Sequence, residues 1–183
     1  MFFAAGFETT QTTLTYCAYE LAKNQEAQER LRDELQEEIG HLKPDSDEYY
    51  ERVMTKIPYL EAVVKETLRK YPPLPRLERR VGVEGYKLGG HLLDKDLLVE
   101  VSAYAVHHNP EYYPEPSRYN PDRFMPENKH LLTPYTYLPF GQGPRNCVGM
   151  RFAYQEIKLA LAKIVARYRF TCNERTPDRL KFL

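Results

Sequence analysis

Apolar side chains recur at helical spacing over the first part of the chain. Residues 2–23 are predicted to form one long helix that is apolar at its start. In residues 24–39, Leu31, Leu35 and Ile39 recur every four positions among charged residues. This spacing predicts a second helix with a narrow apolar stripe on one face.

Two further helices are predicted later in the chain. Residues 41–56 are interpreted as a polar connection, after which Pro58 suits the first turn of a helix that continues to Tyr71 and ends before Pro72. A final helix is predicted from about 148 to 168, where apolar residues three or four positions apart form a single stripe. This stripe consists of Met150, Ala153, Ile157, Leu161, Ile164 and Tyr168.

The middle of the chain is rich in proline and lacks helical periodicity. Residues 72–144 hold 11 of the 14 prolines. Three short strands are predicted between Gly and Asp turns, at Val81–Val83, Tyr86–Leu88 and Leu97–Val101. Residues 109–146 are expected to be a long loop, and a loop of that length within a compact domain is usually functional.

The composition fits one globular domain and excludes several classes of protein. The chain has 183 residues, of which 42% are hydrophobic, and its formal net charge is +0. A neutral chain is unlike a nucleic-acid-binding protein held by bulk electrostatics. Three widely separated cysteines do not make a disulfide framework. The sequence holds no run of about 18 apolar residues, so no membrane span is expected in it. Its apolar start resembles a helix entered in its middle, so we expect part of a longer protein.

Charge is balanced over the whole chain but not locally. Residues 20–52 hold 11 acidic and 5 basic residues, whereas residues 141–183 hold 3 acidic and 9 basic residues. Solvated faces of opposite sign account for this pattern. The alternative interpretation is a basic docking surface near the C-terminus.

A lone cysteine, Cys147, follows a glycine-rich turn and is predicted to open the last helix. A helix N-terminus carries unpaired N–H groups and partial positive charge, and Arg145 adds a further positive charge, so a thiolate is favoured there. Gly143 and Gly149 leave room for a flat ligand or a second backbone. The alternative is a small buried cysteine without chemistry, which is the usual state of a free cysteine.

The ten residues around this cysteine resemble the haem-binding loop of the cytochrome P450 family. The family pattern Phe-x-x-Gly-x-Arg-x-Cys-x-Gly is matched by Phe140, Gly143, Arg145, Cys147 and Gly149. The resemblance implies that Cys147 is the axial ligand of a haem iron, and that its electron donation favours O–O cleavage. It also implies that Arg145 meets a haem propionate and that Phe140 packs beside the thiolate and limits its access to water.

A second set of residues agrees with this resemblance. Glu66 and Arg69 lie one helical turn apart, which alone is typical of a surface ion pair. The family has a Glu-x-x-Arg helix whose pair is buried and joined by an arginine from a later meander, and Arg123 takes that place here. Tyr119 and Asp122 stand where the family more often has Phe and Glu. The resemblance implies that Glu66, Arg69 and Arg123 are structural and lock the cysteine loop.

A third motif, at the beginning of the chain, resembles the oxygen-binding helix of the family. Its Ala-Gly-x-Glu-Thr pattern is matched by Ala5, Gly6, Glu8 and Thr9. An acid and an alcohol inside an apolar helix are otherwise unusual, unless they face solvent. The resemblance implies an oxygen-binding groove at Ala5 and Gly6, a hydrogen bond from Thr9 to the bound oxygen, and proton delivery through water by Glu8.

The resemblance assigns roles to a few residues between these motifs. Arg79 would be a second propionate partner on a strand beside the haem, and residues 74–76 would border the substrate. Residues 93–96 replace the usual Pro-Lys-Gly hairpin turn of the family. His107 and His108 are interpreted as ordinary loop-edge histidines, because neighbouring residues on a strand point to opposite faces and cannot share one metal ion.

The implied fold is mainly α-helical with small β-sheets. It corresponds to the C-terminal portion of the cytochrome P450 fold, with an oxygen-binding helix, Glu-x-x-Arg helix, meander, cysteine loop and proximal helix in one incomplete domain over residues 1–183. Within the family, the similarity is to microsomal drug-metabolising members and to thromboxane synthase. A membrane anchor and early helices would lie outside this sequence, and the chain alone is expected to be inactive.

The implied activity is that of a haem-thiolate monooxygenase that uses haem b, iron protoporphyrin IX. Such an enzyme inserts one oxygen atom from dioxygen into a small apolar substrate of the steroid, lipid or xenobiotic class, with electrons from a flavoprotein reductase. The implied location is the cytoplasmic face of the endoplasmic reticulum membrane, and no nucleic-acid partner is expected. Two alternatives remain open: a haem-thiolate isomerase or dehydratase acting on peroxides, and a non-catalytic haem-binding fragment.

Overall fold

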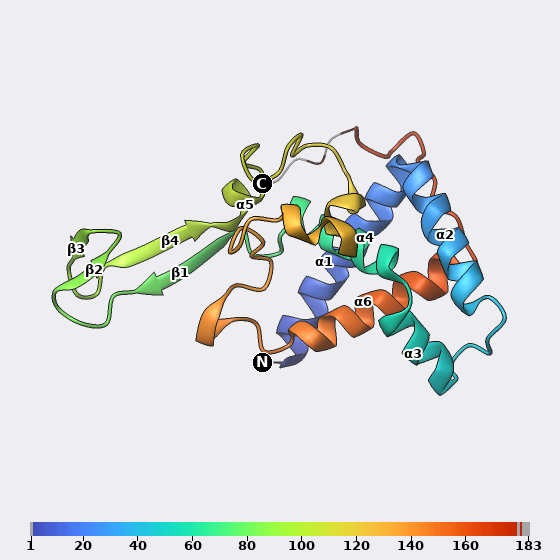
Figure 1. Ribbon diagram of the computed structural model, residues 1–183, viewed down its shortest axis with the longest axis horizontal. Helices are drawn as coiled ribbons and strands as arrows, with labels where there is room; N and C mark the ends of the chain where they lie inside the picture. The colour runs from blue at the N-terminus through green and yellow to red at the C-terminus, as the bar shows by residue number, and fades with distance from the viewer. Residues whose placement is uncertain (1, 179, 181–183) are drawn as a thin grey trace.

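The computed structural model describes residues 2–178 and 180, and most of its ordered elements are helices (Figure 1). Four long helices form the body: α1 (Phe2–Lys23), α2 (Gln25–Ile39), α4 (Pro58–Lys70) and α6 (Met150–Val165). They lie where the apolar periodicity predicts helices, and the described residues also form small antiparallel sheets. The prediction of a mainly α-helical fold with small β-sheets is therefore confirmed.

Helix α4 lies within the helical body and packs against α1, α2 and α6. It is buried on almost every face, and its apolar residues Leu60, Val64 and Leu68 are at most 1% exposed. Burying a side chain of this size contributes about 1.5–3 kcal/mol. A polar side chain on such a helix is tolerated only where hydrogen bonds compensate for the lost water.

The stripe predicted for the last helix is buried only in part. Ile157 and Leu161 lie in the core, whereas Ile164 and Tyr168 are exposed. Helix α6 ends at Val165, which is itself buried, so the last turn buries a different position from the one that the periodicity predicts.

The segment predicted as a polar connection contains a helix, α3 (Asp47–Thr55). The Ser46 side-chain oxygen caps this helix, because it accepts a 3.2 Å hydrogen bond from the Tyr49 N–H. Tyr49 and Val53 are buried one turn apart, and the helix packs against α2 and α6. The prediction was wrong because the segment is short and mostly polar. The serine cap and the spacing of the two apolar residues were the available signals.

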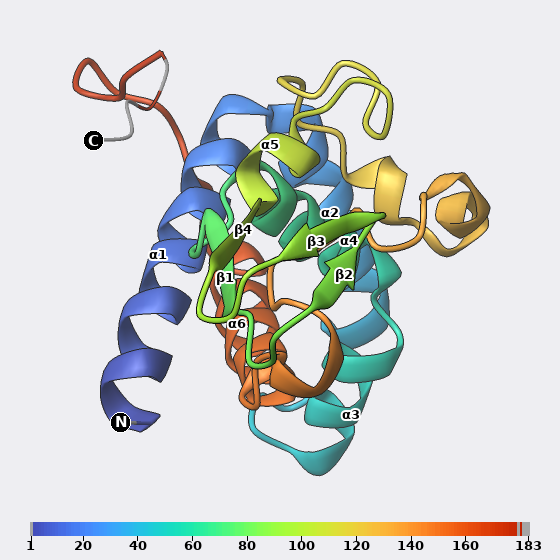
Figure 2. The same ribbon diagram turned by 90° about the vertical axis from the view of Figure 1, so that its left-hand side faces the viewer.

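A narrow β-arm projects from the helical body (Figures 1 and 2). In this arm β1 (Arg76–Arg80) pairs with β4 (Leu98–Ser102), and β2 (Tyr86–Leu88) pairs with β3 (His91–Leu93), both antiparallel. The prediction of β2 is confirmed, β4 is displaced by one residue, and β3 was not predicted. The strand predicted at Val81–Val83 is wrong. The sequence of β1, Arg-Leu-Glu-Arg-Arg, becomes a strand through its pairing with β4.

Left-handed backbone conformations shape the turns of the arm. Gly89 and Gly90 join β2 to β3 with φ values of 55° and 86°, as a two-residue type I′ hairpin requires. Asp96 lies in the segment that departs from the Pro-Lys-Gly turn of the family, and its φ is 67°. Asp is among the few residues that adopt this region more readily, so the arm accommodates the departure.

The predicted long loop is built from short turns. Helix α5 (Ala103–His107) precedes it, and it contains the 3₁₀ helices η1 (Pro121–Phe124), η2 (Pro126–Leu131) and η3 (Gly143–Arg145). The turn η1 packs against α4, which brings this irregular region to the centre of the body. Across the described range, 2–178 and 180, none of the helices has the length and hydropathy that a membrane crossing needs.

Candidate functional site

The loop that carries Cys147 is closed at its base by its own backbone. The Cys147 N–H donates a 2.8 Å hydrogen bond to the Phe140 carbonyl, and the Asn146 N–H donates a 3.1 Å bond to the Gly143 carbonyl. The Phe140 ring packs on the Tyr154 ring of α6, with centroids 5.2 Å apart. The base of the loop is therefore anchored to α6, while the residues at its tip are exposed.

Two glycines give this loop a backbone path that other residues rarely follow. The φ angle is 72° at Gly141 and 78° at Gly143, so a side chain at either position would strain the backbone. A Cβ on Gly143 would meet nothing within 4 Å among the described residues. No backbone of the described residues therefore approaches Gly143 closely. Of the two expected reasons for this glycine, space for a flat ligand is the one that remains.

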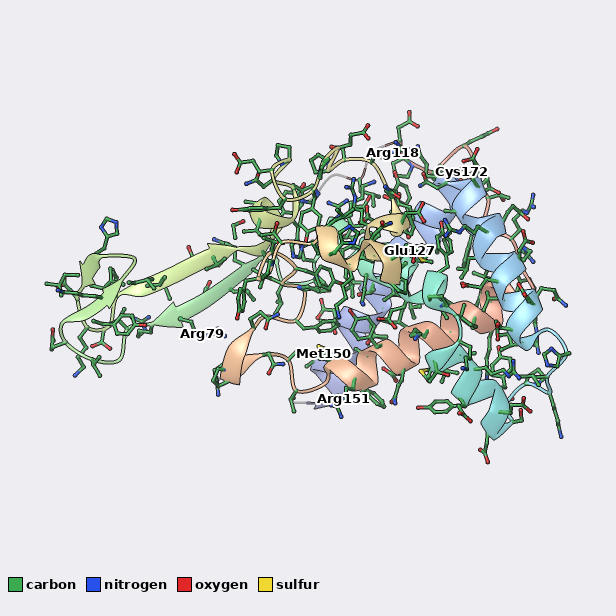
Figure 3. All side chains as sticks on the ribbon, in the orientation of Figure 1. Arg79, Arg118, Glu127, Met150, Arg151 and Cys172 are labelled. Carbon is green, nitrogen blue, oxygen red and sulfur yellow. The ribbon has the colours of Figure 1, made fainter. Side chains whose placement is uncertain are left out.

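Cys147 is an exposed free thiol. Helix α6 begins at Met150 with Gly149 at its N-cap, so the cysteine precedes the helix rather than opening it (Figure 3 shows Met150 and Arg151 at this helix start). The helix dipole falls off within the first turn, so it acts less on this sulfur than predicted. Val148, the next residue, is 86% exposed, and a large apolar side chain in that state is available to pack on a ligand.

The start of α1 lies at the same end of the helical body as the start of α6 (Figures 1 and 2). Glu8 is exposed and Thr9 is half-buried. The Thr9 hydroxyl donates a 2.7 Å hydrogen bond to the Ala5 carbonyl one turn back, which leaves its oxygen lone pairs as acceptors. A Cβ on Gly6 would meet nothing within 4 Å in the described part of the chain, so the space beside this helix is open.

The two arginines expected at the haem propionates come from different elements. Arg79 lies on β1 in the arm (Figure 3), and Arg145 lies in η3 within the cysteine loop; both are exposed. The loop approaches this strand, because a Cβ on Gly141 would lie 4.0 Å from Leu77 Cδ2. The fold therefore brings β1 and the cysteine loop together, although 60 or more residues separate them in the sequence.

Glu66 and Arg69 form a fully buried ion pair on α4 rather than a surface pair. Arg69 donates two hydrogen bonds to the carboxylate, from Nε to Oε2 at 2.7 Å and from Nη2 to Oε1 at 2.9 Å. The Asn120 N–H donates a third at 2.9 Å, and Arg69 Nη2 also donates to the Pro116 carbonyl at 2.9 Å. A buried pair of charges is stable only with such bidentate and fully compensated geometry.

Arg123 approaches the same carboxylate from η1. Its Nε lies 3.6 Å from Glu66 Oε1, and its Nη2 donates a 3.1 Å hydrogen bond to the Glu115 carbonyl. Burial lowers the pKa of Arg123 against the opposing effect of Glu66. The structure therefore brings together Glu66, Arg69 and Arg123, the three residues that the sequence analysis groups.

Tyr119 and Asp122, which depart from the family pattern, both find polar partners on neighbouring helices. The Tyr119 hydroxyl donates a 3.1 Å hydrogen bond to the Val63 carbonyl and lies 3.1 Å from Thr67 Oγ1. The Asp122 carboxylate pairs with Arg30 of α2, with Oδ1 and Nη1 2.6 Å apart. Each substituted side chain therefore joins the meander to a neighbouring helix.

His107 is a candidate that the sequence analysis missed. It ends α5 and is 0% exposed, so its interpretation as a loop-edge histidine was wrong. Its Nδ1 lies 3.0 Å from the Arg69 carbonyl, and its Nε2 accepts a 2.8 Å hydrogen bond from the Leu138 N–H. The carbonyl can only accept and the amide can only donate, so the ring is neutral with its proton on Nδ1. Burial lowers the pKa of His107 from 6.5 to about 4, in agreement with a neutral ring.

The donor set fits a porphyrin iron better than a bare metal ion. Among the residues described, no group of three or more His, Cys, Asp or Glu side chains is arranged to hold a metal. A single exposed thiol with nearby open space and exposed arginines suits a metal that brings most of its ligands with it.

Fold and loop together point to the haem-thiolate class of proteins. The sequence profile described as "Cytochrome P450" matches residues 1–182, and the chain belongs to the cytochrome P450 family. Membership of this family implies haem as the cofactor.

Curated relatives match over the whole chain. The chain is 44% identical to cytochrome P450 6k1 of Blattella germanica, over 99% of this chain and 34% of that protein. It is 41% identical to probable cytochrome P450 6a13 of Drosophila melanogaster, over 100% of this chain and 36% of that protein. It is 42% identical to cytochrome P450 3A11 of Mus musculus, over 99% of this chain and 35% of that protein. The chain therefore spans about a third of the length of these relatives.

Proposed function

We propose that the protein is a haem-thiolate monooxygenase that inserts one oxygen atom from dioxygen into a small apolar organic substrate of the steroid, lipid or xenobiotic class. The observation that carries the proposal is the exposed Cys147 thiol, presented by a glycine turn whose base is hydrogen-bonded to Phe140. An exposed sulfur on a loop closed by backbone hydrogen bonds could hold the iron of a haem. Membership of the cytochrome P450 family supports the same function.

Cys147 would hold the iron of haem b, iron protoporphyrin IX, through its sulfur. Gly143 and Gly149 would leave room for the porphyrin face, and Arg79 and Arg145 would pair with the propionates. Both arginines are exposed, so each can turn its guanidinium toward a carboxylate. When bound, the haem supplies the redox chemistry that splits dioxygen.

Glu8 and Thr9 would take part in delivering protons to the reaction. One oxygen atom enters the substrate and the other leaves as water, so the reaction consumes two electrons and two protons. Thr9 would donate a hydrogen bond to the oxygen, for which its hydroxyl would turn away from the Ala5 carbonyl to which it donates at 2.7 Å. Glu8 is exposed and can exchange protons with water. Ala5 and Gly6 would border the oxygen, where the space beside α1 is open.

The buried residues Glu66, Arg69 and Arg123 are proposed to be structural. Glu66 and Arg69 are 0% exposed and cannot touch substrate. Their hydrogen bonds reach the meander that leads to the cysteine loop, so they fix the framework on which Cys147 is mounted.

A flavoprotein reductase is the proposed electron donor, docking on the Cys147 face. Residues 141–183 hold 9 basic and 3 acidic residues, which suits an acidic partner. By analogy with microsomal members of the family, we place the protein at the cytoplasmic face of the endoplasmic reticulum membrane.

The ferrous carbon monoxide spectrum tests the ligand, and it is recorded on a haem-loaded, full-length version that contains these residues, because the chain alone is expected to be inactive. We expect a Soret band in the thiolate position that is lost in Cys147→Ser, because serine offers no thiolate sulfur. Cys172→Ser is the matched control, since Cys172 is also an exposed free cysteine. A thiolate band that survives in Cys147→Ser would contradict the assignment.

Turnover by the same full-length version then tests the reaction. Substrate oxidation that requires both reductase and dioxygen supports the monooxygenase. Conversion of a peroxide without any reductase would instead identify a haem-thiolate isomerase or dehydratase.

A further inference from the structure

The base of the cysteine loop is joined to helix α4 through one imidazole. His107 Nε2 accepts the Leu138 N–H at 2.8 Å, and the Leu138 carbonyl accepts the Gly141 N–H at 3.1 Å at the beginning of the glycine turn. On its other edge, the ring donates from Nδ1 to the Arg69 carbonyl at 3.0 Å. We propose that His107 is a positioning residue for the Cys147 ligand, because it fixes the loop base relative to α4. This inference rests on the proposed function.

Arg69 and His107 hold each other through two hydrogen bonds of opposite direction. The Arg69 guanidinium donates from Nη1 to the His107 carbonyl at 2.8 Å, while the His107 ring donates to the Arg69 carbonyl. The backbone and the side chain of His107 are therefore both tied to the residue that pairs with Glu66. These two bonds orient the ring so that its Nε2 faces the N–H of Leu138.

Aromatic neighbours restrict the plane of the ring. Tyr137 stacks on His107 with centroids 5.8 Å apart and an interplanar angle of 21°, and Tyr113 meets it edge-on at 6.3 Å. The Tyr137 hydroxyl lies 3.3 Å from the Tyr154 hydroxyl on α6 and donates to the Lys65 carbonyl at 3.3 Å. Through Tyr137, the position of the His107 ring is therefore fixed relative to α4 and α6. The ring in turn fixes the cysteine loop relative to these two helices.

An imidazole supplies a donor and an acceptor from two edges of one rigid group. Both ring nitrogens of His107 are engaged and the side chain is buried, so it acts neither as a metal ligand nor as an exchangeable proton carrier. Asparagine can reproduce a donor near the Nδ1 position, and glutamine can reproduce an acceptor near the Nε2 position. The two substitutions therefore separate the bond to Arg69 from the bond to Leu138.

The test compares His107→Gln, His107→Asn and His107→Ala in the haem-loaded protein. We expect the Asn and Ala variants to bind haem about tenfold more weakly, at the lower end of what the loss of an outer-shell partner costs a metal site. In these two variants a larger fraction of the ferrous carbon monoxide complex should leave the thiolate form. Glutamine should restore both properties, and hydrogen exchange in peptides covering residues 138–147 should be faster only in the Asn and Ala variants.

His108→Gln is the matched control at the next residue, the C-cap of α5. His108 Nδ1 lies 2.9 Å from the Tyr104 carbonyl and its ring stacks on Tyr104, so this variant should keep the wild-type spectrum. Equal behaviour of the Gln and Asn variants, or a normal thiolate fraction in all three with only a lower melting temperature, would overturn the positioning role. If the wild type itself lacks the thiolate band, the proposed function fails, and the exchange of residues 138–147 still decides whether His107 holds the loop.

Discussion

The buried cluster of Glu66, Arg69, His107 and Arg123 and the exposed site around Cys147 treat their polar groups in opposite ways. In the cluster, guanidinium, carboxylate and imidazole are matched by partners from the chain itself. Among the buried side-chain nitrogen and oxygen atoms of the described residues, only Arg123 Nε lacks a hydrogen bond, and Glu66 Oε1 lies 3.6 Å from it. At the site, the thiol and the candidate arginines face solvent. Almost all polar groups of the cluster are matched within the chain, so substitutions of its charged members Glu66, Arg69 and Arg123 should act on stability. The site is shaped for a ligand, so substitutions there should act on chemistry.

Glu66→Gln should give the largest loss of stability. The substitution removes the buried charge that compensates Arg69, and breaking a buried pair from one side costs about 3–5 kcal/mol. Urea unfolding of the haem-loaded protein, followed by circular dichroism, measures the change in the free energy of unfolding. Glu115→Gln is the control, since its carboxylate pairs with Arg118 at 3.4 Å on the surface and its loss should cost about 0–1 kcal/mol. Equal losses in both variants would remove the distinction between the two regions.

Glu8→Gln should have the converse effect. Glu8 is exposed, so the free energy of unfolding should change by less than about 0.5 kcal/mol. Reductase-dependent turnover should fall about a hundredfold, because the amide cannot pass a proton. Glu37→Gln, at an exposed position of α2, should leave both quantities unchanged. A Glu8→Gln variant with full turnover would show that proton delivery does not depend on this carboxylate.

Acid should weaken the cluster through His107. The pKa of His107 is about 4 in the folded protein, against an ordinary value of 6.5, so the unfolded chain binds a proton first as the pH falls. The free energy of unfolding should therefore decrease between pH 6.5 and pH 4, and the contribution of His107 between about pH 7 and pH 5 is about 2 kcal/mol. His107→Gln should lack this contribution in unfolding titrations, whereas the exposed control His130→Gln should retain it. Identical slopes in His107→Gln and the wild type would show that the ring is not held neutral.

The sequence predicts the long helices well because their information is local. The four-residue spacing of Leu31, Leu35 and Ile39 requires a helix wherever one face is buried, and the core contains all three. Helix α3 was missed although Ser46 provides a capping signal. Strand β1 could not be found in this way, because its five residues lack alternation and depend on pairing with β4.

In the candidate site, too, features encoded by neighbouring residues could be predicted, and features that depend on distant residues could not. The cysteine loop is recognisable because its pattern is continuous in the sequence. The partners of His107 are 38 residues before it and 31 residues after it, at Arg69 and Leu138, so no local pattern marks the ring as buried or as a link between elements. The grouping of Glu66, Arg69 and Arg123 came from family resemblance, since i, i+3 spacing alone is typical of a surface pair.

The β-arm should be the first part of the molecule to open on warming. A ribbon of paired strands with exposed residues such as Leu92 and Leu98 holds itself weakly, so it opens at little cost while the helical body stays intact. Arg79 lies on this ribbon and would move with it, whereas Cys147 lies in a loop anchored to the helical body. If both residues hold haem as proposed, the contact from Arg79 should be lost at a lower temperature than the contact from Cys147, before the helical body unfolds.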